Sequence, residues 1–165
     1  MAVKHKTIIN KFPEMTKQLD LLNGEGVEVG VFNGEHKWLA PIHEYGMAIK
    51  VTPKMRRYLW GKGLKVGKVV RIPERSFLRT GYDKNIDDVA KKAGLLLADV
   101  AGGKTTARGC YQAVGIALSS KIKDYAVNLN SPPNHPFTVE QKGSSNPLVG
   151  KAGDMIDGIS WRKAK

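Results

Sequence analysis

The sequence has few of the residues that mark secreted, membrane-spanning or metal-dependent proteins. Its 165 residues include one cysteine, Cys110, and four histidines. A single cysteine excludes an internal disulfide framework and favours a reducing compartment. No apolar run approaches the roughly 20 residues of a membrane helix, and the N-terminal stretch lacks a signal-peptide core. We therefore expect a protein that is made and kept in a cytoplasm and has no membrane partner.

Acidic residues are also scarce, and the resulting positive charge is unevenly placed. The chain has 27 Lys and Arg against 15 Asp and Glu, a net charge of +12. Residues 50–79 hold ten of the basic residues and only one acid, Glu74. The ten are Lys50, Lys54, Arg56, Arg57, Lys62, Lys65, Lys68, Arg71, Arg75 and Arg79. Such a segment favours a polyanion or an acidic protein as partner, and the alternative is a solvated face that only aids solubility.

The spacing of apolar residues predicts a series of short elements in the first half of the chain. Helical spacing predicts helices over 13–22, 36–46 and 53–63. Alternation predicts strands over 26–32, 48–52 and 68–72. Pro41 lies inside the second of these helices, so it must belong to the first turn or kink the helix.

Two longer helices follow, and they are expected to supply most of the core. The first has Asp83 as its predicted cap and extends to about Val100; the second extends from about Thr105 to Leu129. Residues 154–161 are expected to add a turn of helix and a strand. The order predicts a single α+β domain over residues 1–165, with a small mixed or antiparallel sheet packed against the two longer helices.

Between these elements lies a segment, residues 131–153, that is rich in proline, glycine, serine and asparagine. This composition cannot form one regular element. A loop of this length in a compact domain is usually functional or disordered. We expect it to be a long, flexible C-terminal loop that becomes ordered in an assembly.

Two stretches of the sequence match catalytic motifs in part, and neither matches completely. The stretch AGGKTT (101–106) would need a glycine at Ala98, and a strand before it, to bind phosphate as a P-loop. The stretch IHEYG has Met47 where a zinc-protease helix needs its second histidine, and His36 and His43 would lie too far apart to share a metal. Cys110 is expected to be a buried apolar residue. We predict no catalytic residue, no metal site, no cofactor and no enzymatic activity.

Four segments in order carry a resemblance to a known family. They are VEVGVF (27–32), LAPIHEYG (39–46), IPERSFLR (72–79) and SSNPLVGKAGDMIDGIS (144–160). Together they resemble the neck or tail-completion proteins of long-tailed bacteriophages, which join the head to the tail. The last segment departs from the family pattern, because residues 150–153 replace the usual Asp-Thr-Gly.

The resemblance implies a structural virion protein without catalytic activity. Such proteins are small α+β domains that form a ring at the head-proximal end of the tail, and a hexamer is the expected state. The implied partners are the tail tube or tail terminator protein, the head connector or head-completion protein, and the double-stranded DNA in the bore. The implied location is the virion neck, reached from the host cytoplasm during assembly.

Seven residues are expected to face a partner or DNA: Lys54, Arg56, Arg57, Arg71, Arg75, Phe77 and Arg79. In IPERSFLR, Pro73 favours an extended backbone, and the two arginines are planar cations suited to carboxylates or phosphates. Phe77 can anchor either in a neighbouring subunit or in its own core.

Two other functions remain open. A free nucleic-acid-binding protein would explain the basic segment, although no zinc-finger or RNA-binding signature accompanies it. A small nuclease would need several acids that converge on one point, and the sequence shows no such set.

Overall fold

The protein is described by a computed structural model that covers residues 11–24, 26–32, 37–150 and 154–164. Within these residues the chain forms helices and strands in the following order: α1 (Phe12–Asp20), β1 (Val27–Val31), α2 (Leu39–Tyr45), β2 (Met47–Lys50), α3 (Pro53–Gly61), β3 (Val69–Ile72), α4 (Phe77–Ala101), α5 (Ala107–Asn128), α6 (Pro136–Lys142), α7 (Asp154–Asp157) and β4 (Ile159–Lys163). The predicted α+β fold is confirmed.

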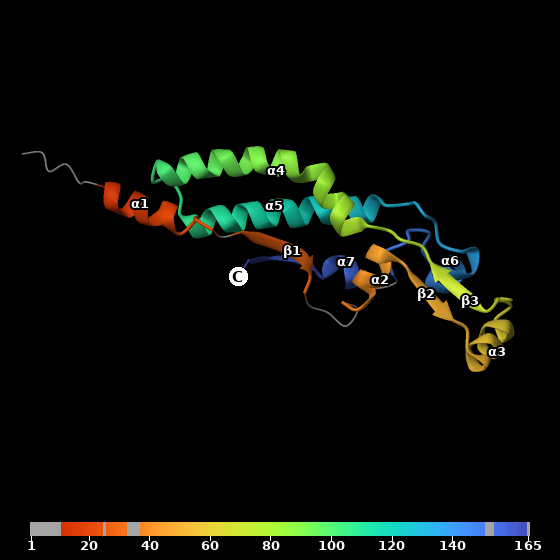
Figure 1. Cartoon of the computed structure of the whole chain (residues 1–165). Coiled ribbons are helices and arrows are strands. Elements are labelled where there is room, and N and C mark those ends of the chain that lie inside the picture. Colours follow the sequence, from red (N-terminus) through yellow and green to blue (C-terminus); the bar gives the residue numbers. More distant parts are fainter. Residues whose placement is uncertain (1–10, 25, 33–36, 151–153, 165) are drawn as a thin grey trace, which may run out of the picture.

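One part of the molecule, here called the body, is built around the long antiparallel helices α4 and α5 (Figure 1). A two-stranded antiparallel sheet, β1 with β4, packs against α5, with Val27 opposite Lys163 and Val31 opposite Ile159. The core contains apolar residues from both helices and from the sheet. Its largest fully buried side chains include Phe77, Ile159 and Val100.

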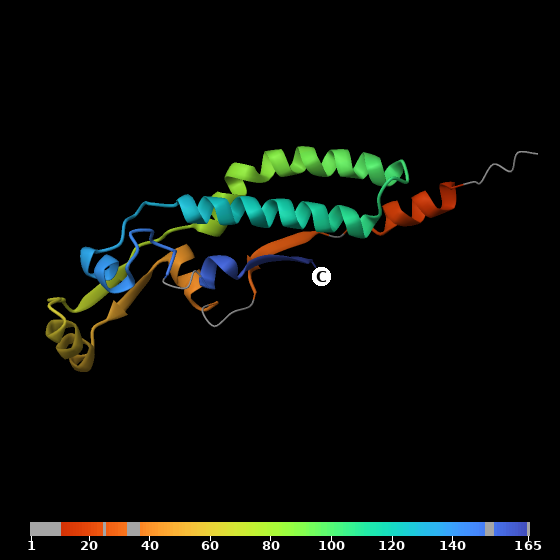
Figure 2. The ribbon, with the colours of Figure 1, turned by 180° about the vertical axis from the view of Figure 1, so that it is seen from behind.

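The second part, here called the arm, comprises residues 47–72. Strands β2 and β3 form an antiparallel pair, from Met47 opposite Ile72 to Lys50 opposite Val69, and α3 connects them. Both views of the ribbon show the arm extending from one end of the molecule, opposite the end that carries α1 (Figures 1 and 2). No residue of the arm is buried. Its shape therefore depends on the strand pairing and on turns rather than on a core of its own.

Most predicted elements are present near their expected positions. Pro41 is the third residue of α2, so the predicted placement in the first turn is correct. The side chain of Thr106 accepts a hydrogen bond from the backbone N–H of Gly109 and so caps α5. A short helix and a strand, α7 and β4, follow the predicted order at the end of the chain.

Two elements differ from the prediction. Helix α4 begins at Phe77, six residues before the predicted cap Asp83, which lies within the helix. The segment 131–153, predicted as a long loop, contains the seven-residue helix α6, for which His135 is the N-cap and Gly143 the left-handed C-cap. Residues 151–153 of that segment lie outside the described part of the chain.

Candidate functional site

The arm concentrates exposed positive charge. Its sequence contains no aspartate or glutamate, and every one of its lysines and arginines is exposed. These residues are Lys50, Lys54, Arg56, Arg57, Lys62, Lys65, Lys68 and Arg71. Among the described residues none of the eight takes part in an ion pair. A field of one sign with no local counter-charge attracts a polyanion or an acidic surface.

Helix α3 places part of this charge at the outer end of the arm. It begins at Pro53, after Thr52, whose hydroxyl oxygen accepts a hydrogen bond from Met55 N at 3.2 Å. Met55 and Leu59 lie four positions apart on one side of the helix and are partly buried.

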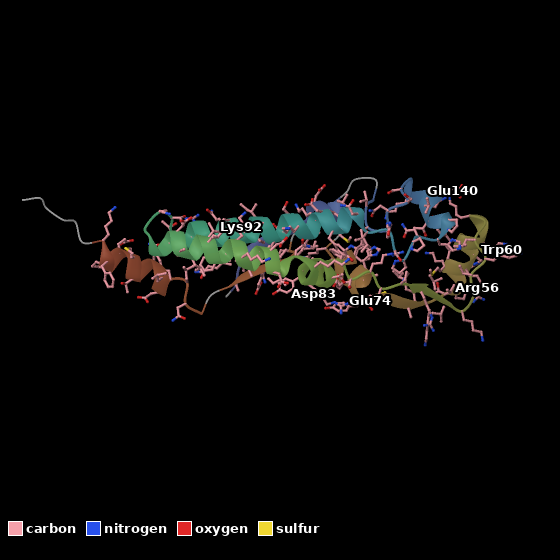
Figure 3. All side chains as sticks on the ribbon, turned by 90° about the horizontal axis from the view of Figure 1, so that it is seen from above. Arg56, Trp60, Glu74, Asp83, Lys92 and Glu140 are labelled. Carbon is pink, nitrogen blue, oxygen red and sulfur yellow. The ribbon has the colours of Figure 1, made fainter. Side chains whose placement is uncertain are left out.

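The remaining side of α3 faces solvent. Trp60 and Tyr58 are 66% and 64% exposed, and Arg56 and Arg57 lie beside them. Figure 3 shows Arg56 and Trp60 at the end of the molecule, far from Lys92 on the helical body. The exposed face thus combines cations with large aromatic rings.

A buried carboxylate joins α2, the helix that precedes the arm, to the start of α4. Glu44, 3% exposed, accepts hydrogen bonds from the backbone N–H groups of Leu78 (2.9 Å) and Arg79 (3.0 Å). These are orphan donors of the first turn of α4, and a carboxylate is the favoured partner there. This tertiary cap explains why α4 begins before Asp83. The signal in the sequence was the spacing of Ala40 and Glu44, four apart in α2, which puts an acid on the buried face of the helix.

Arg79 is held by the same carboxylate. Its Nε donates to Glu44 Oε1 at 3.0 Å and its Nη2 to Glu74 Oε1 at 2.6 Å, and the guanidinium lies 4.7 Å from the centre of the Tyr45 ring. Hydrogen bonds to Glu44, and then to Glu74, raise the pKa of Arg79 above its usual value. Arg79 is half-exposed, but its charge is already paired within the chain.

Arg75 fastens the base of the arm to the segment after α5. Its Nε donates to the carbonyl oxygen of Pro132 at 2.8 Å, and its Nη2 donates to Pro133 O and Asn134 Oδ1, each at 3.1 Å. Its backbone N–H donates to His43 O at 2.7 Å. Arg75 is 4% exposed, and burial lowers its pKa.

Asn146 completes this connection on the C-terminal side. Its Oδ1 accepts from the backbone N–H groups of Leu148 (2.8 Å) and Val149 (2.9 Å), while its Nδ2 donates to Val127 O at the end of α5. Asn134 Nδ2 donates to Asn146 O at 3.4 Å. The turn at Asn146 therefore forms its hydrogen bonds with described residues of α5 and of its own segment.

Gly46 is required where the arm leaves α2. Its φ of +71° lies in the region that favours glycine, and an added Cβ would lie 2.9 Å from Ile72 O and 3.0 Å from Glu74 N. The segments LAPIHEYG, IPERSFLR and SSNPLVG, far apart in the sequence, thus meet in one hydrogen-bonded cluster. We call this cluster the junction, and its members are His43, Glu44, Gly46, Glu74, Arg75, Arg79, Asn134, Lys142 and Asn146.

The structure divides the seven predicted contact residues into three groups. Lys54, Arg56, Arg57 and Arg71 are exposed on the arm. Arg79, at the start of α4, is also exposed, but its charge is paired with Glu44 and Glu74. Phe77, by contrast, has no exposed surface and packs in the core of its own chain, and Arg75 is enclosed by the junction. The predicted contact of these last two side chains with a partner or DNA is therefore replaced by roles within the chain. The arm and the junction form the candidate site.

The described residues contain no group of three or more His, Cys, Asp or Glu that could hold a metal ion. Burial raises the pKa of the Cys110 thiol, which lies in α5. No described helix is long and apolar enough to cross a membrane.

Comparison of this chain with protein-family models, curated proteins and solved structures found no match.

Proposed function

We propose that this protein is a structural virion component that joins the tail of a long-tailed phage to its head, as a ring at the head-proximal end of the tail. One observation carries the proposal: a projecting arm with eight exposed cations and no acid is attached by a junction built from three of the four segments that carry the resemblance. The arm makes the electrostatic contacts, and the body supports it.

The positive charge of the arm is compatible with a position in the neck between the phage head and tail. A ring of chains that each carry a net charge of +12 would repel itself unless other charges offset it. The phosphates of DNA in the bore, or carboxylates on the adjoining head and tail proteins, supply that offset. We therefore expect the isolated chain to be largely monomeric at low salt and to form its ring on the tail end or the connector. The proposed role needs no cofactor.

A charge reversal on the arm tests the proposal. Arg56→Glu with Arg57→Glu should leave the free energy of unfolding within about 0.5 kcal/mol of the wild type, because both side chains are exposed. Electron microscopy of particles assembled with this variant should show separate heads and tails.

The matched control reverses the same amount of charge on the body. Lys91→Glu with Lys92→Glu changes two adjacent exposed residues of α4, away from the arm (Figure 3). This control should give joined particles. Joined particles with the arm variant would refute the role of the arm, and failure of both variants would show that only total charge matters.

The exposed aromatic residues of α3 favour a second candidate, a free nucleic-acid-binding protein. Near Trp60, arginines lie beside aromatic rings. In such an arrangement the arginines can bind the phosphates of a nucleic acid and the rings can stack on its bases. Both candidates predict DNA binding that weakens steeply with salt. Native mass spectrometry with and without tail tubes separates them, because only the joining protein should form a closed ring on the tube.

A further inference from the structure

Two positive charges in the junction have no carboxylate partner among the residues that the structure describes. Arg75 gives its charged hydrogen bonds to the neutral oxygens of Pro132, Pro133 and Asn134. Lys142, half-buried at the end of α6, donates to the carbonyl oxygens of Asn146 (3.1 Å) and Pro147 (2.8 Å). Buried charges are normally paired with an opposite charge, since neutral acceptors offset only part of the lost hydration.

The two acids of the junction do not offset them. Glu74, next to Arg75 in sequence, is exposed and accepts from Arg79 Nη2 at 2.6 Å. The Glu44 carboxylate is occupied by the first turn of α4 and by Arg79. His43 Nδ1 lies 3.5 Å from Arg75 Nη1. Burial, then the charges of Arg75 and Lys142, lower the pKa of His43 to about 4. The cluster therefore carries an uncompensated positive charge at neutral pH.

A cavity of about 400 Å³ lies beside this cluster, between the arm and the segment before α6. Its basic lining residues are His43, Lys65, Arg71, Arg75 and His135. The rest of the lining is largely apolar and includes Val70 and Ile72 of β3 and the ring of Pro133. The size is within the range of pockets that bind small ligands or a few side chains.

We propose that this cavity receives an acidic residue, flanked by apolar residues, from a protein partner. The carboxylate would supply the missing counter-charge to Arg75 and to the cations at the cavity mouth, Lys65 and Arg71, and its apolar neighbours would cover the walls. A DNA backbone fits less well, because consecutive phosphates need a long hydrated groove, whereas this is a single concave cavity with largely apolar walls. The inference rests on the proposed function only for the identity of the partner, which would be an adjoining virion protein.

Short peptides test this site directly. The probe is the blocked tripeptide Leu-Glu-Leu, and its control is Leu-Gln-Leu, which has the same shape without the charge. Binding is followed through the ring-proton NMR signals of His43 and by calorimetry. We expect the glutamate peptide to shift the His43 signals saturably and to bind at least about tenfold more tightly than the glutamine peptide. Equal binding of the two peptides would overturn the proposal.

Matched double variants locate the binding. Lys65→Ala with Arg71→Ala removes two charges that line the cavity, whereas Arg56→Ala with Arg57→Ala removes two from α3, which does not line it. All four residues are exposed, so both variants should fold, as circular dichroism can verify. The cavity variant should lose at least about tenfold in affinity for the glutamate peptide, and the α3 variant should keep it. An equal loss of affinity in both variants would mean that the peptide binds through general charge attraction and not in the cavity, and it would overturn the proposal.

Two further probes decide the chemistry of the ligand. Inorganic phosphate or a duplex oligonucleotide that shifts the His43 signals at lower concentration than the glutamate peptide would overturn the assignment to a protein carboxylate. Failure here is distinct from failure of the proposed function, because peptide binding and particle joining are measured separately.

Discussion

The body and the arm differ in what holds them together. The body buries apolar side chains from α4, α5 and both strands of its sheet, so its shape follows from packing. The arm has no buried residue and no acid, and its shape follows from strand pairing and from the cap of α3. Changes in the body should therefore alter stability, and changes in the arm should alter binding. The junction, where buried polar groups join the two, should be the most sensitive place.

The largest loss of stability is expected from the junction. Glu44→Ala removes the acceptor for two backbone N–H groups of α4 and opens a buried polar site, so we expect the free energy of unfolding to fall by about 2–4 kcal/mol. Urea denaturation measures this. Glu74→Ala is the matched control, since Glu74 contacts the same Arg79 from an exposed position and should matter far less. Similar losses in the two variants would contradict the assignment of Glu44 as a cap.

Two glycines of the body should respond in opposite directions. Gly115 is buried on α5 against the indole of Trp161, and an added Cβ would overlap that ring, so Gly115→Ala should cost about 1–3 kcal/mol. Gly94, in the exposed part of α4, has open space around it, so Gly94→Ala should gain about 0.5–1 kcal/mol. Thermal unfolding can rank both against the wild type. A stabilised Gly115→Ala variant would show that the sheet does not pack tightly on α5.

A smaller effect should appear with pH at the junction. His43 has a pKa of about 4 in the folded protein and about 6.5 when unfolded, owing to burial and to the charges of Arg75 and Lys142. The unfolded chain therefore binds the proton first, so stability is full above pH 6.5 and declines as the pH falls toward 4. His43→Gln should flatten this decline between pH 6.5 and 5. An unchanged pH profile in the variant would mean that His43 does not contribute.

The smallest change in stability should follow removal of the arm itself. Met47 and Ile72 are antiparallel partners, so an Asn-Gly turn can join them in place of residues 48–71. We expect the body to stay folded, with a change in the free energy of unfolding of about 1 kcal/mol or less, because no buried residue is lost. The shortened chain should fail to join heads and tails. A chain that does not fold would show that the arm is part of the core structure.

The sequence predicted the elements whose signals lie in neighbouring residues, and it did not predict the features that depend on contacts between distant residues. The alternation in residues 26–32 identified β1, and the apolar spacing that begins after Thr105 identified α5, because both signals are local. The start of α4 could not be found in this way, since its cap is Glu44, more than thirty positions earlier. For the same reason the sequence predicted one small sheet, whereas the strands form two separate antiparallel pairs, β1 with β4 and β2 with β3.

The candidate site was predicted in part. The cluster of basic residues identified the exposed face of α3 correctly as a surface feature, because lysine and arginine are exposed by default. That default was wrong for Arg75, whose acceptors are backbone carbonyls of Pro132 and Pro133 that carry no sequence signal. The helix α6 was missed because residues 131–153 were interpreted from their overall composition, whereas Pro136 is the first residue of a short helix, where proline is favoured.

The pairing of β1 with β4 also sets an order of events during folding. Arg162 donates to Glu28, 134 positions away, so this sheet closes nearly the whole length of the chain. Contacts of such long range carry a large entropic cost of loop closure and form late, whereas α4 and α5 adjoin in sequence and can pair early. On the ribosome, the helical pair can assemble while β1 still lacks its partner. The body is complete only after β4 has been synthesised. The arm is therefore synthesised, and its strands can pair, before β1 and β4 form the sheet of the body.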